Sequence, residues 1–122
     1  MFQPGHLHRT NLPGLHEKLS YTLDLYYDVR SDPKEGTMLH FRLVGKVDGR
    51  AFEEEFELHR DTAFNFASMV TRVASKHGLH PHLGPILRDH QDYDAMFEDI
   101  RQKLNVQPGE PVNLDHLLKD GF

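Results

Sequence analysis

The sequence predicts an α+β fold in which a three-stranded antiparallel meander is followed by two or three helices packed on one face of the sheet. Three observations lead to this fold class. Apolar and polar residues alternate over residues 19–59, as in half-buried strands. An Asp48-Gly49 pair divides the later part of that region, and a helical period replaces the alternation after residue 61.

The alternation defines three strands with one apolar face. The turn-forming stretch from Ser31 to Gly36 separates the first strand from the second. Asp48-Gly49 then predicts a two-residue hairpin, because both central positions of a type I′ turn need a positive φ. The residues of the apolar face on the first two strands are Tyr21, Leu23, Leu25, Tyr27, Val29, Leu39, Phe41, Leu43 and Val47.

The hairpin turn also predicts a register. If Val47 faces Arg50, apolar residues meet on one face and opposite charges meet on the other, which favours pairing. The expected apolar-face neighbours are Phe41–Phe56, Leu39–Leu58 and Gly45–Phe52, and the expected outer-face neighbours are Arg42–Glu55 and His40–Glu57. Placing Leu25 beside Phe41 adds the first strand and predicts the outer rows Asp24–Arg42–Glu55 and Tyr26–His40–Glu57. Glu54 disagrees with the pattern, because it falls on the apolar face opposite Leu43.

The whole chain, residues 1–122, is predicted to form one domain. The Pro4-Gly5 and Pro13-Gly14 pairs predict an irregular lead-in over residues 1–17, before the sheet of residues 19–59. The helical part covers residues 61–120. The features expected there are an N-cap at Asp61, a helix that ends with Gly78 at C′ and Leu79 after it, a short turn from Pro85 to Asp89, a helix from Asp92 to Leu104, and a terminal helix capped by Asn113.

Composition and charge restrict the function. The 122 residues include no cysteine, which excludes disulfides, thiolate catalysis and cysteine-ligated metals. Fourteen Lys and Arg against nineteen Asp and Glu give a net charge of −5, which argues against nucleic acid as a partner. No apolar run approaches membrane-spanning length, so no membrane partner is expected. The N-terminal sequence shows no secretion signal pattern, and we expect a cytoplasmic location.

Ten histidines are present, and they supply the candidate site residues. The stretch from His77 to Pro85 favours a polar bend between two helices, with His77 as a cation at a helix C-terminus. The alternative is a divalent metal site built from His77, His80, His82 and His90, with carboxylates nearby as further ligands. A second pair of the same spacing, His6-Leu7-His8, would present both rings on one side if its backbone is extended. No cofactor other than such a metal is indicated.

Histidines that gain a charge at mildly acidic pH could also act as a pH sensor. His40 opposite Glu57 and His77 at its helix end are the candidates for this role. His59-Arg60-Asp61 has the letters of the kinase catalytic loop, but the surrounding kinase features are absent from the sequence. We interpret that triplet as a strand end followed by an N-cap, and no catalytic residue is predicted.

The N-terminal residues Phe2-Gln3-Pro4-Gly5-His6-Leu7-His8 resemble the opening of a small family of uncharacterised pseudomonad proteins, a domain of unknown function. Similar length and the single-domain layout fit this resemblance. It implies a bacterial cytoplasmic protein, and it carries no established activity or site residues.

The sequence therefore favours an uncharacterised, non-enzymatic interaction or regulatory module that works through protein contacts, as a homodimer or with a protein partner. One alternative is a histidine–carboxylate metal-binding protein, such as a metal-dependent hydrolase. Another is an acidic module resembling a secretion chaperone, which would need a hydrophobic groove.

Overall fold

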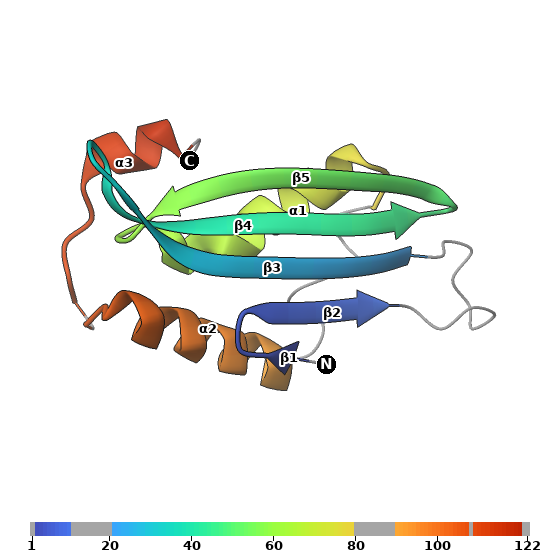
Figure 1. Ribbon diagram of the computed structural model, residues 1–122, viewed down its shortest axis with the longest axis horizontal. Coiled ribbons are helices and arrows are strands. Elements are labelled where there is room, and N and C mark those ends of the chain that lie inside the picture. The colour runs from blue at the N-terminus through green and yellow to red at the C-terminus, as the bar shows by residue number, and fades with distance from the viewer. Residues whose placement is uncertain (1, 11–20, 80–89, 108, 121–122) are drawn as a thin grey trace.

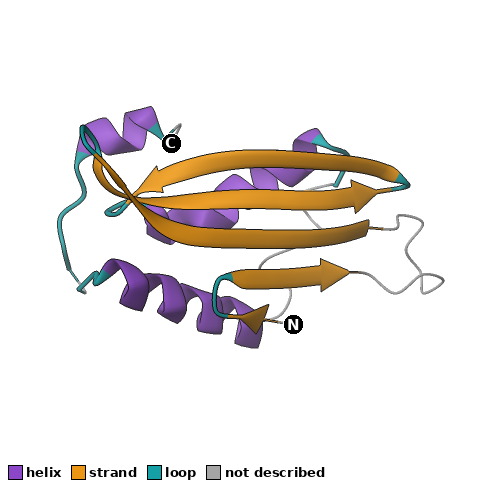
Figure 2. Ribbon diagram, in the orientation of Figure 1, coloured by secondary structure: helices purple, strands orange, loops and turns teal. Residues whose placement is uncertain are grey.

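A computed structural model describes residues 2–10, 21–79, 90–107 and 109–120 of the chain, and it has an α+β architecture (Figures 1 and 2). A five-stranded antiparallel sheet packs against two helices, and a third, short helix lies at one end of the sheet. The elements are β1 (Phe2–Gln3), β2 (His6–Thr10), β3 (Tyr21–Asp32), β4 (Gly36–Val47), β5 (Arg50–His59), the 3₁₀ helix η1 (Ala63–Asn65), α1 (Phe66–Lys76), α2 (His90–Leu104) and α3 (Leu114–Lys119). No helix within these described ranges is long and apolar enough to cross a membrane.

The sheet is a continuous meander in the order β1-β2-β3-β4-β5. The prediction of three strands and an irregular lead-in over residues 1–17 is therefore wrong, because β1 and β2 lie within that lead-in. The Pro4-Gly5 pair forms the turn between these two strands, with Gly5 at φ 85°, a backbone conformation that glycine adopts without steric cost. Leu7 is buried against the core. Residues 11–20 lie outside the described part of the chain.

The predicted register of the β4–β5 hairpin is confirmed at every pair. Val47 faces Arg50, Phe41 faces Phe56 and Gly45 faces Phe52. Asp48 and Gly49 take φ values of 48° and 82°, the positive values that a type I′ turn requires.

The predicted register between the first two long strands is wrong by two residues. Tyr27 lies opposite Phe41, and Leu25 lies opposite Leu43. The outer rows are therefore Tyr26–Arg42–Glu55 and Asp28–His40–Glu57. The turn decides this offset, because Asp32 pairs with Gly36 and its carboxylate accepts the backbone N–H groups of Lys34 and Glu35 at 2.8 and 2.9 Å.

One face of the sheet carries the hydrophobic core, and α1 and α2 cover that face, as predicted. Figure 1 shows α1 behind the long strands, and both helices contribute to the same buried cluster as the sheet. The aromatic rings of Phe41 and Phe56 stack at 4.8 Å, and Phe41 and Phe66 at 6.3 Å. The largest fully buried side chains are Phe41, Phe66, Leu7, Leu23, Leu25, Leu39, Leu43, Leu58, Leu79, Met96 and Val70.

The first helical segment begins differently from the prediction and ends as predicted. Asp61 is not the N-cap, because η1 comes first and Asn65 immediately precedes α1. At the other end, the N–H of Gly78 bonds to Ser75 and that of Leu79 to Ala74. These two bonds form a Schellman motif. The short turn predicted from Pro85 to Asp89 lies outside the described residues.

The helix predicted from Asp92 to Leu104 is confirmed as α2, which begins two residues earlier. Two polar contacts join it to the sheet. Arg9, only 8% exposed, donates to Asp92 at 2.7 Å, and the Tyr27 hydroxyl donates to Asp99 at 2.5 Å. Both side chains project from the core face of the sheet, so the helix is anchored by buried donors as well as by apolar packing.

We predict that Gly45→Ala destabilises the protein by about 1–3 kcal/mol. A Cβ atom at Gly45 would lie 2.6 Å from the ring of Phe52 and 2.7 Å from Leu23, so the core would have to shift. Urea unfolding measures the change. Lys46→Ala, an exposed change on the same strand, is the control and should alter stability by less than about 0.5 kcal/mol. Equal stability of the two variants would contradict the tight packing at Gly45.

A second prediction concerns Asp99. Burial raises the pKa of its carboxyl, but hydrogen bonds from Lys103 and Tyr27 outweigh burial and bring the pKa below its ordinary value. The stabilisation is therefore present above the unfolded-state pKa of about 3.9 and is lost as the pH falls through the folded-state value. Asp99→Asn should reduce the free energy of unfolding by about 1.5–3 kcal/mol at pH 7.

The difference between the wild type and Asp99→Asn should shrink as the pH falls below about 4. Urea unfolding at a series of pH values measures this. A difference that stays constant from pH 7 to pH 3 would show that the charge of Asp99 contributes nothing.

Candidate functional site at the end of the sheet

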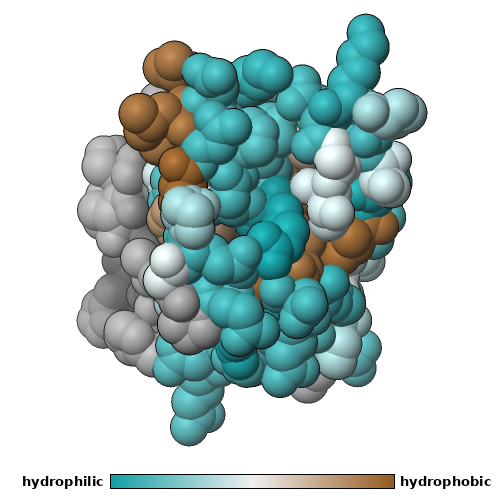
Figure 3. All heavy atoms as spheres, turned by 90° about the vertical axis from the view of Figure 1, so that its left-hand side faces the viewer, coloured by the Kyte–Doolittle hydropathy of each residue, from teal (hydrophilic) through white to brown (hydrophobic). Residues whose placement is uncertain are grey.

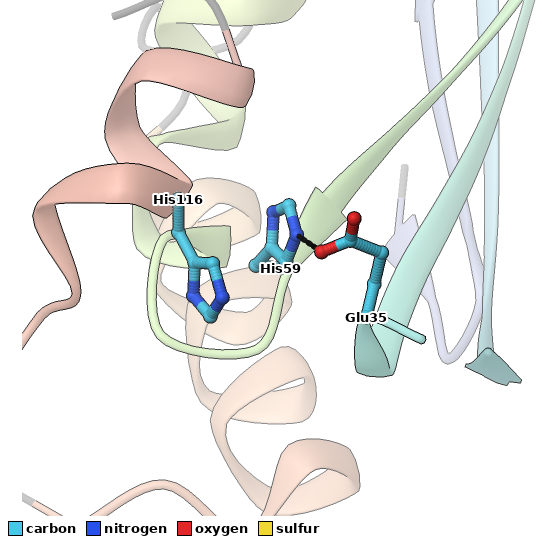
Figure 4. A group of neighbouring side chains, drawn as sticks. All are labelled: Glu35, His59 and His116. Carbon is cyan, nitrogen blue, oxygen red and sulfur yellow. Dashed lines mark hydrogen bonds and ion pairs between the residues drawn. The ribbon is translucent and has the colours of Figure 1, made fainter. Parts of the chain in front are cut away.

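Five ionisable side chains from three distant parts of the sequence meet at one end of the sheet. Glu35 comes from the β3–β4 turn, His59 ends β5, Asp61 follows it, and His116 and Asp120 come from α3 and its C-cap. We call these five residues the histidine cluster. Figure 1 shows α3 lying over the end of the sheet where the β3–β4 turn and the end of β5 meet, and Figure 4 shows the two rings and Glu35.

His59 lies at the centre of the cluster, only 3% exposed. Its Nδ1 lies 2.8 Å from Asp120 Oδ1, and its Nε2 lies 2.9 Å from Glu35 Oε2. Carboxylates only accept hydrogen bonds, so both ring nitrogens donate in this arrangement and the ring is an imidazolium. Burial lowers the pKa of His59, but the bonds to Glu35 and Asp120 outweigh burial and raise the pKa above its ordinary value.

Asp120 connects α3 to the end of β5. Its carboxylate accepts the His59 ring and also the His59 backbone N–H, the latter at 3.1 Å. It also accepts the hydroxyl of Thr62, which is fully buried. Three donors thus reach one nearly buried carboxylate, and all three come from residues 59–62.

His116 lies on the other side of His59. The two rings stack, with centroids 3.9 Å apart and planes inclined by 10°. His116 Nδ1 donates to Asp61 Oδ1 at 2.7 Å, and Asp61 also accepts the backbone N–H of Asn113 at 2.8 Å. Burial raises the pKa of Asp61, but these bonds from Asn113 and His116 outweigh burial and lower it. Asp61 is therefore ionised and fixes both the start of α3 and the orientation of its histidine.

Glu35 completes the cluster from the β3–β4 turn. Lys119 of α3 donates to both of its carboxylate oxygens, at 2.9 and 3.2 Å. Hydrogen bonds from His59 and Lys119 lower the pKa of Glu35 to about 2. The carboxylate is therefore ionised at neutral pH, and it faces His59 and an open hollow of about 450 Å³ that both residues line.

Arg60, between the two cluster residues His59 and Asp61, points toward α2 instead. It donates to the backbone carbonyls of Leu104 at 2.8 Å and Asn105 at 2.6 Å, and it pairs with Glu110 through its two terminal nitrogens, Nη1 and Nη2. A cation at a helix C-terminus satisfies carbonyls that have no partner within the helix. Residues 59–61 thus hold α3 and the end of α2 to the same strand.

Of the predicted metal ligands, the structure describes the side chain of His77 alone. His77 Nε2 lies 2.6 Å from Glu54 Oε2, and its ring stacks on Phe52 at 4.1 Å. This contact accounts for Glu54 on the apolar face, because Glu54 accepts bonds from Lys76 and His77 there. His80 and His82 lie outside the described residues, and His90 begins α2 with a side chain outside the description.

The other histidine pair behaves as its spacing predicts. His6 and His8 lie on an extended strand, and both rings reach the carboxylate of Asp24 on β3, at 2.7 and 2.8 Å.

The histidine cluster was not predicted from the sequence. Its one local signal is the triplet His59-Arg60-Asp61 at the end of an apolar strand, which we interpreted as a strand end and an N-cap.

We predict that Asp120→Asn lowers the free energy of unfolding by about 2–4 kcal/mol. An amide would place donor hydrogens against the donors of His59 and Thr62 and would remove the charge opposite the imidazolium. Thermal and urea unfolding measure the loss. Asp115→Asn, exposed on the same helix, is the matched control and should change stability by less than about 0.5 kcal/mol. A fully stable Asp120→Asn protein would contradict the central position of this carboxylate.

The chain is similar to the solution structure of an uncharacterized protein from Pseudomonas aeruginosa, with 54% identity and a TM-score of 0.73 over 98% of this chain and 94% of that one. It matches no curated protein. The model of a family described as a domain of unknown function, DUF5064, matches residues 1–117. The chain therefore belongs to the DUF5064 family.

Proposed function

We propose that the protein is a non-enzymatic interaction module that binds a second copy of itself, through α3 and an apolar pocket beside it. The observation that carries this proposal is the orientation of α3. A surface helix normally turns its apolar side chains toward the core, but α3 leaves Leu114 and Leu118 in solvent.

His116 and Lys119 of α3 bond to the protein body, and two of its three leucines, Leu114 and Leu118, face solvent. His116 and Lys119 bond to Asp61 and Glu35 of the body. Leu114 and Leu118, four residues apart on one side of the helix, are 73% and 74% exposed. Figure 3 shows hydrophobic side chains gathered at one corner of this end of the molecule, beside a mostly hydrophilic surface. Apolar side chains gathered in this way on a soluble protein are typical of an interaction site.

An apolar pocket of about 250 Å³ lies at the same end. Asp61 joins the two features, because it lines the pocket and also bonds to the start of α3. Phe64, half exposed at 50%, is part of the wall. The apolar residues that line the pocket are Ala63, Phe64, Phe97, Ile100, Leu104 and Val106. This combination of a concave apolar surface and a few polar groups at its edge is typical of binding sites.

A second copy suits this surface because the ridge formed by Leu114 and Leu118 lies at the same end of the chain as the apolar pocket. In a twofold dimer the leucine ridge of each copy can enter the pocket of the other, so each contact occurs twice and the assembly closes. Arg60 and Arg101 also line the pocket, but each already pairs with a glutamate, Glu110 and Glu98, so the apolar side chains carry this proposal.

The β5 edge of the sheet is unsuited to a dimer. β5 is the last strand in the order of the sheet, and it exposes Glu53, Glu55 and Glu57 along its outer face. Two such strands side by side would bring like charges together, which is destabilising. Edge-to-edge pairing is therefore disfavoured relative to contact through α3.

A cytoplasmic location is part of this proposal, and fractionation of cells that express the chain would test it.

We predict a concentration-dependent dimer that the double change Leu114→Ser with Leu118→Ser weakens. Each buried leucine contributes about 1.5–3 kcal/mol, so the dimer dissociation constant should rise by at least about tenfold. Sedimentation equilibrium measures the constant. Because neither leucine is buried in the monomer, the thermal stability of the dilute protein should remain unchanged. Val29→Ser, at an exposed valine of β3, is the control and should leave the constant unchanged.

A protein that stays monomeric at millimolar concentration would contradict the dimer. The chaperone-like alternative predicts such a monomer, and its pocket would hold an apolar segment of another protein. Fluorescence of an apolar dye then distinguishes them, because a monomer with an open apolar pocket binds the dye and Phe64→Asp abolishes the binding.

A further inference from the structure

We propose that Glu35, His59 and His116 form a binding site for one divalent transition-metal ion, with zinc as the preferred ion. Each residue offers one ligand atom, and these three atoms all lie within 4.8 Å of one another. Two imidazoles and one carboxylate are a common ligand set for zinc. The site lies away from His77, and it uses none of the leucines of the proposed dimer surface.

The strongest support is the way in which the two rings are held. His59 Nδ1 lies 2.8 Å from Asp120 and His116 Nδ1 lies 2.7 Å from Asp61. Histidines that bind metals nearly always donate the other ring N–H to a carboxylate, a carbonyl or water, which fixes the tautomer and leaves the second nitrogen for the metal. Both histidines of this site have such a carboxylate at Nδ1, so Nε2 is the atom of each that would bind the metal, that of His59 after it loses its proton to Glu35 or water.

The proposed site is also open to solvent on the side of Glu35 and His59. Glu35 and His59 line the hollow of about 450 Å³, which gives an ion a path to the site. Three protein ligands leave one coordination position for water, the arrangement of open rather than closed zinc sites. In Figure 4 the carboxylate of Glu35 and the ring of His59 point toward each other, with the ring of His116 beside them on α3.

The charges around the site suit a divalent cation. Three carboxylates, those of Glu35, Asp61 and Asp120, surround the rings, and the ammonium of Lys119 is the one fixed cation that bonds to this group among the described residues. With both imidazoles neutral, two negative charges remain. One divalent ion balances them, and so do two protons on the rings. Metal and protons therefore compete for the same group, as in other histidine sites.

Binding changes two contacts of the structure. The proton shared by His59 Nε2 and Glu35 Oε2 along a 2.9 Å bond leaves, and the ion takes its place. The two rings must also leave their parallel stack at 3.9 Å, because each lone pair lies in its own ring plane and the planes must converge on one ion. His116 is partly exposed and has a carboxylate at one ring nitrogen, whereas His59 has one at each, so the ring of His116 is the one that adjusts.

Zinc titration of the untagged, chelator-treated protein tests the proposal. We expect one equivalent of zinc to bind, and cobalt to give the strong visible absorption of a four-coordinate site. Glu35→Gln and His116→Gln should each weaken zinc binding by at least about tenfold. Neither side chain is buried in the core, so circular dichroism should show that both variants keep the fold.

His77→Gln is the matched control, because His77 also pairs with a glutamate on its ring nitrogen but lies outside the site. It should bind zinc as the wild type does. The double variant His80→Ala with His82→Ala should also bind normally. In nitrogen NMR spectra of the imidazoles, zinc should shift the Nε2 resonances of His59 and His116 and leave that of His77 in place.

Two results would overturn the proposal. The first is the absence of stoichiometric zinc or cobalt binding to the wild-type protein. The second is binding that survives in Glu35→Gln and His116→Gln and is lost in the His80→Ala, His82→Ala variant, which would assign the metal to the residues first predicted from the sequence. Neither result bears on the dimer, which is measured in the presence of chelator.

Discussion

The hydrogen bonds that hold the buried ring of His59 determine how the C-terminal part of the chain meets the sheet. The ring joins Asp120 of the α3 C-cap to Glu35 of the β3–β4 turn, so three segments that are distant in sequence depend on one side chain. α3 contributes no buried side chain within its own length, and polar contacts therefore fix its position. The neighbouring residues Arg60 and Asp61 extend the same role to the end of α2 and the start of α3.

The sequence predicts the β4–β5 hairpin well because turn chemistry and side-chain period agree there. Asp48-Gly49 allows one register, and the apolar and charged rows confirm it. The β3–β4 register was wrong by two residues for a physical reason. A shift of two keeps every side chain on its own face, so the pattern cannot distinguish the two registers, and the Asp32 turn decides. β2 was missed because Arg9 occupies an inward position, where its partner is Asp92 on a distant helix.

The candidate site was less predictable than the fold. Its residues come from positions 35, 59–61 and 116–120, and only the three-dimensional meeting of a turn, a strand end and a C-terminal helix brings them together. The sequence predicted a metal site at the closely spaced histidines from His77 to His90 instead, because spacing is the one local signal for metal ligands. His77 illustrates the difference, because its partner Glu54 is a residue that the strand pattern had marked as an exception. The acidic residue on the apolar face thus belongs to a partly exposed ion pair.

The outward leucines of α3 have an evolutionary consequence. In most helices the residues that bind a partner lie beside residues that the core requires, and a change of partner then risks the fold. Leu114 and Leu118 contact solvent while the core cluster is complete without them. These two side chains, and with them the proposed contact, can therefore change at little cost to folding. His116 and Lys119 of the same helix have no such freedom, because their bonds to Asp61 and Glu35 hold α3 to the sheet.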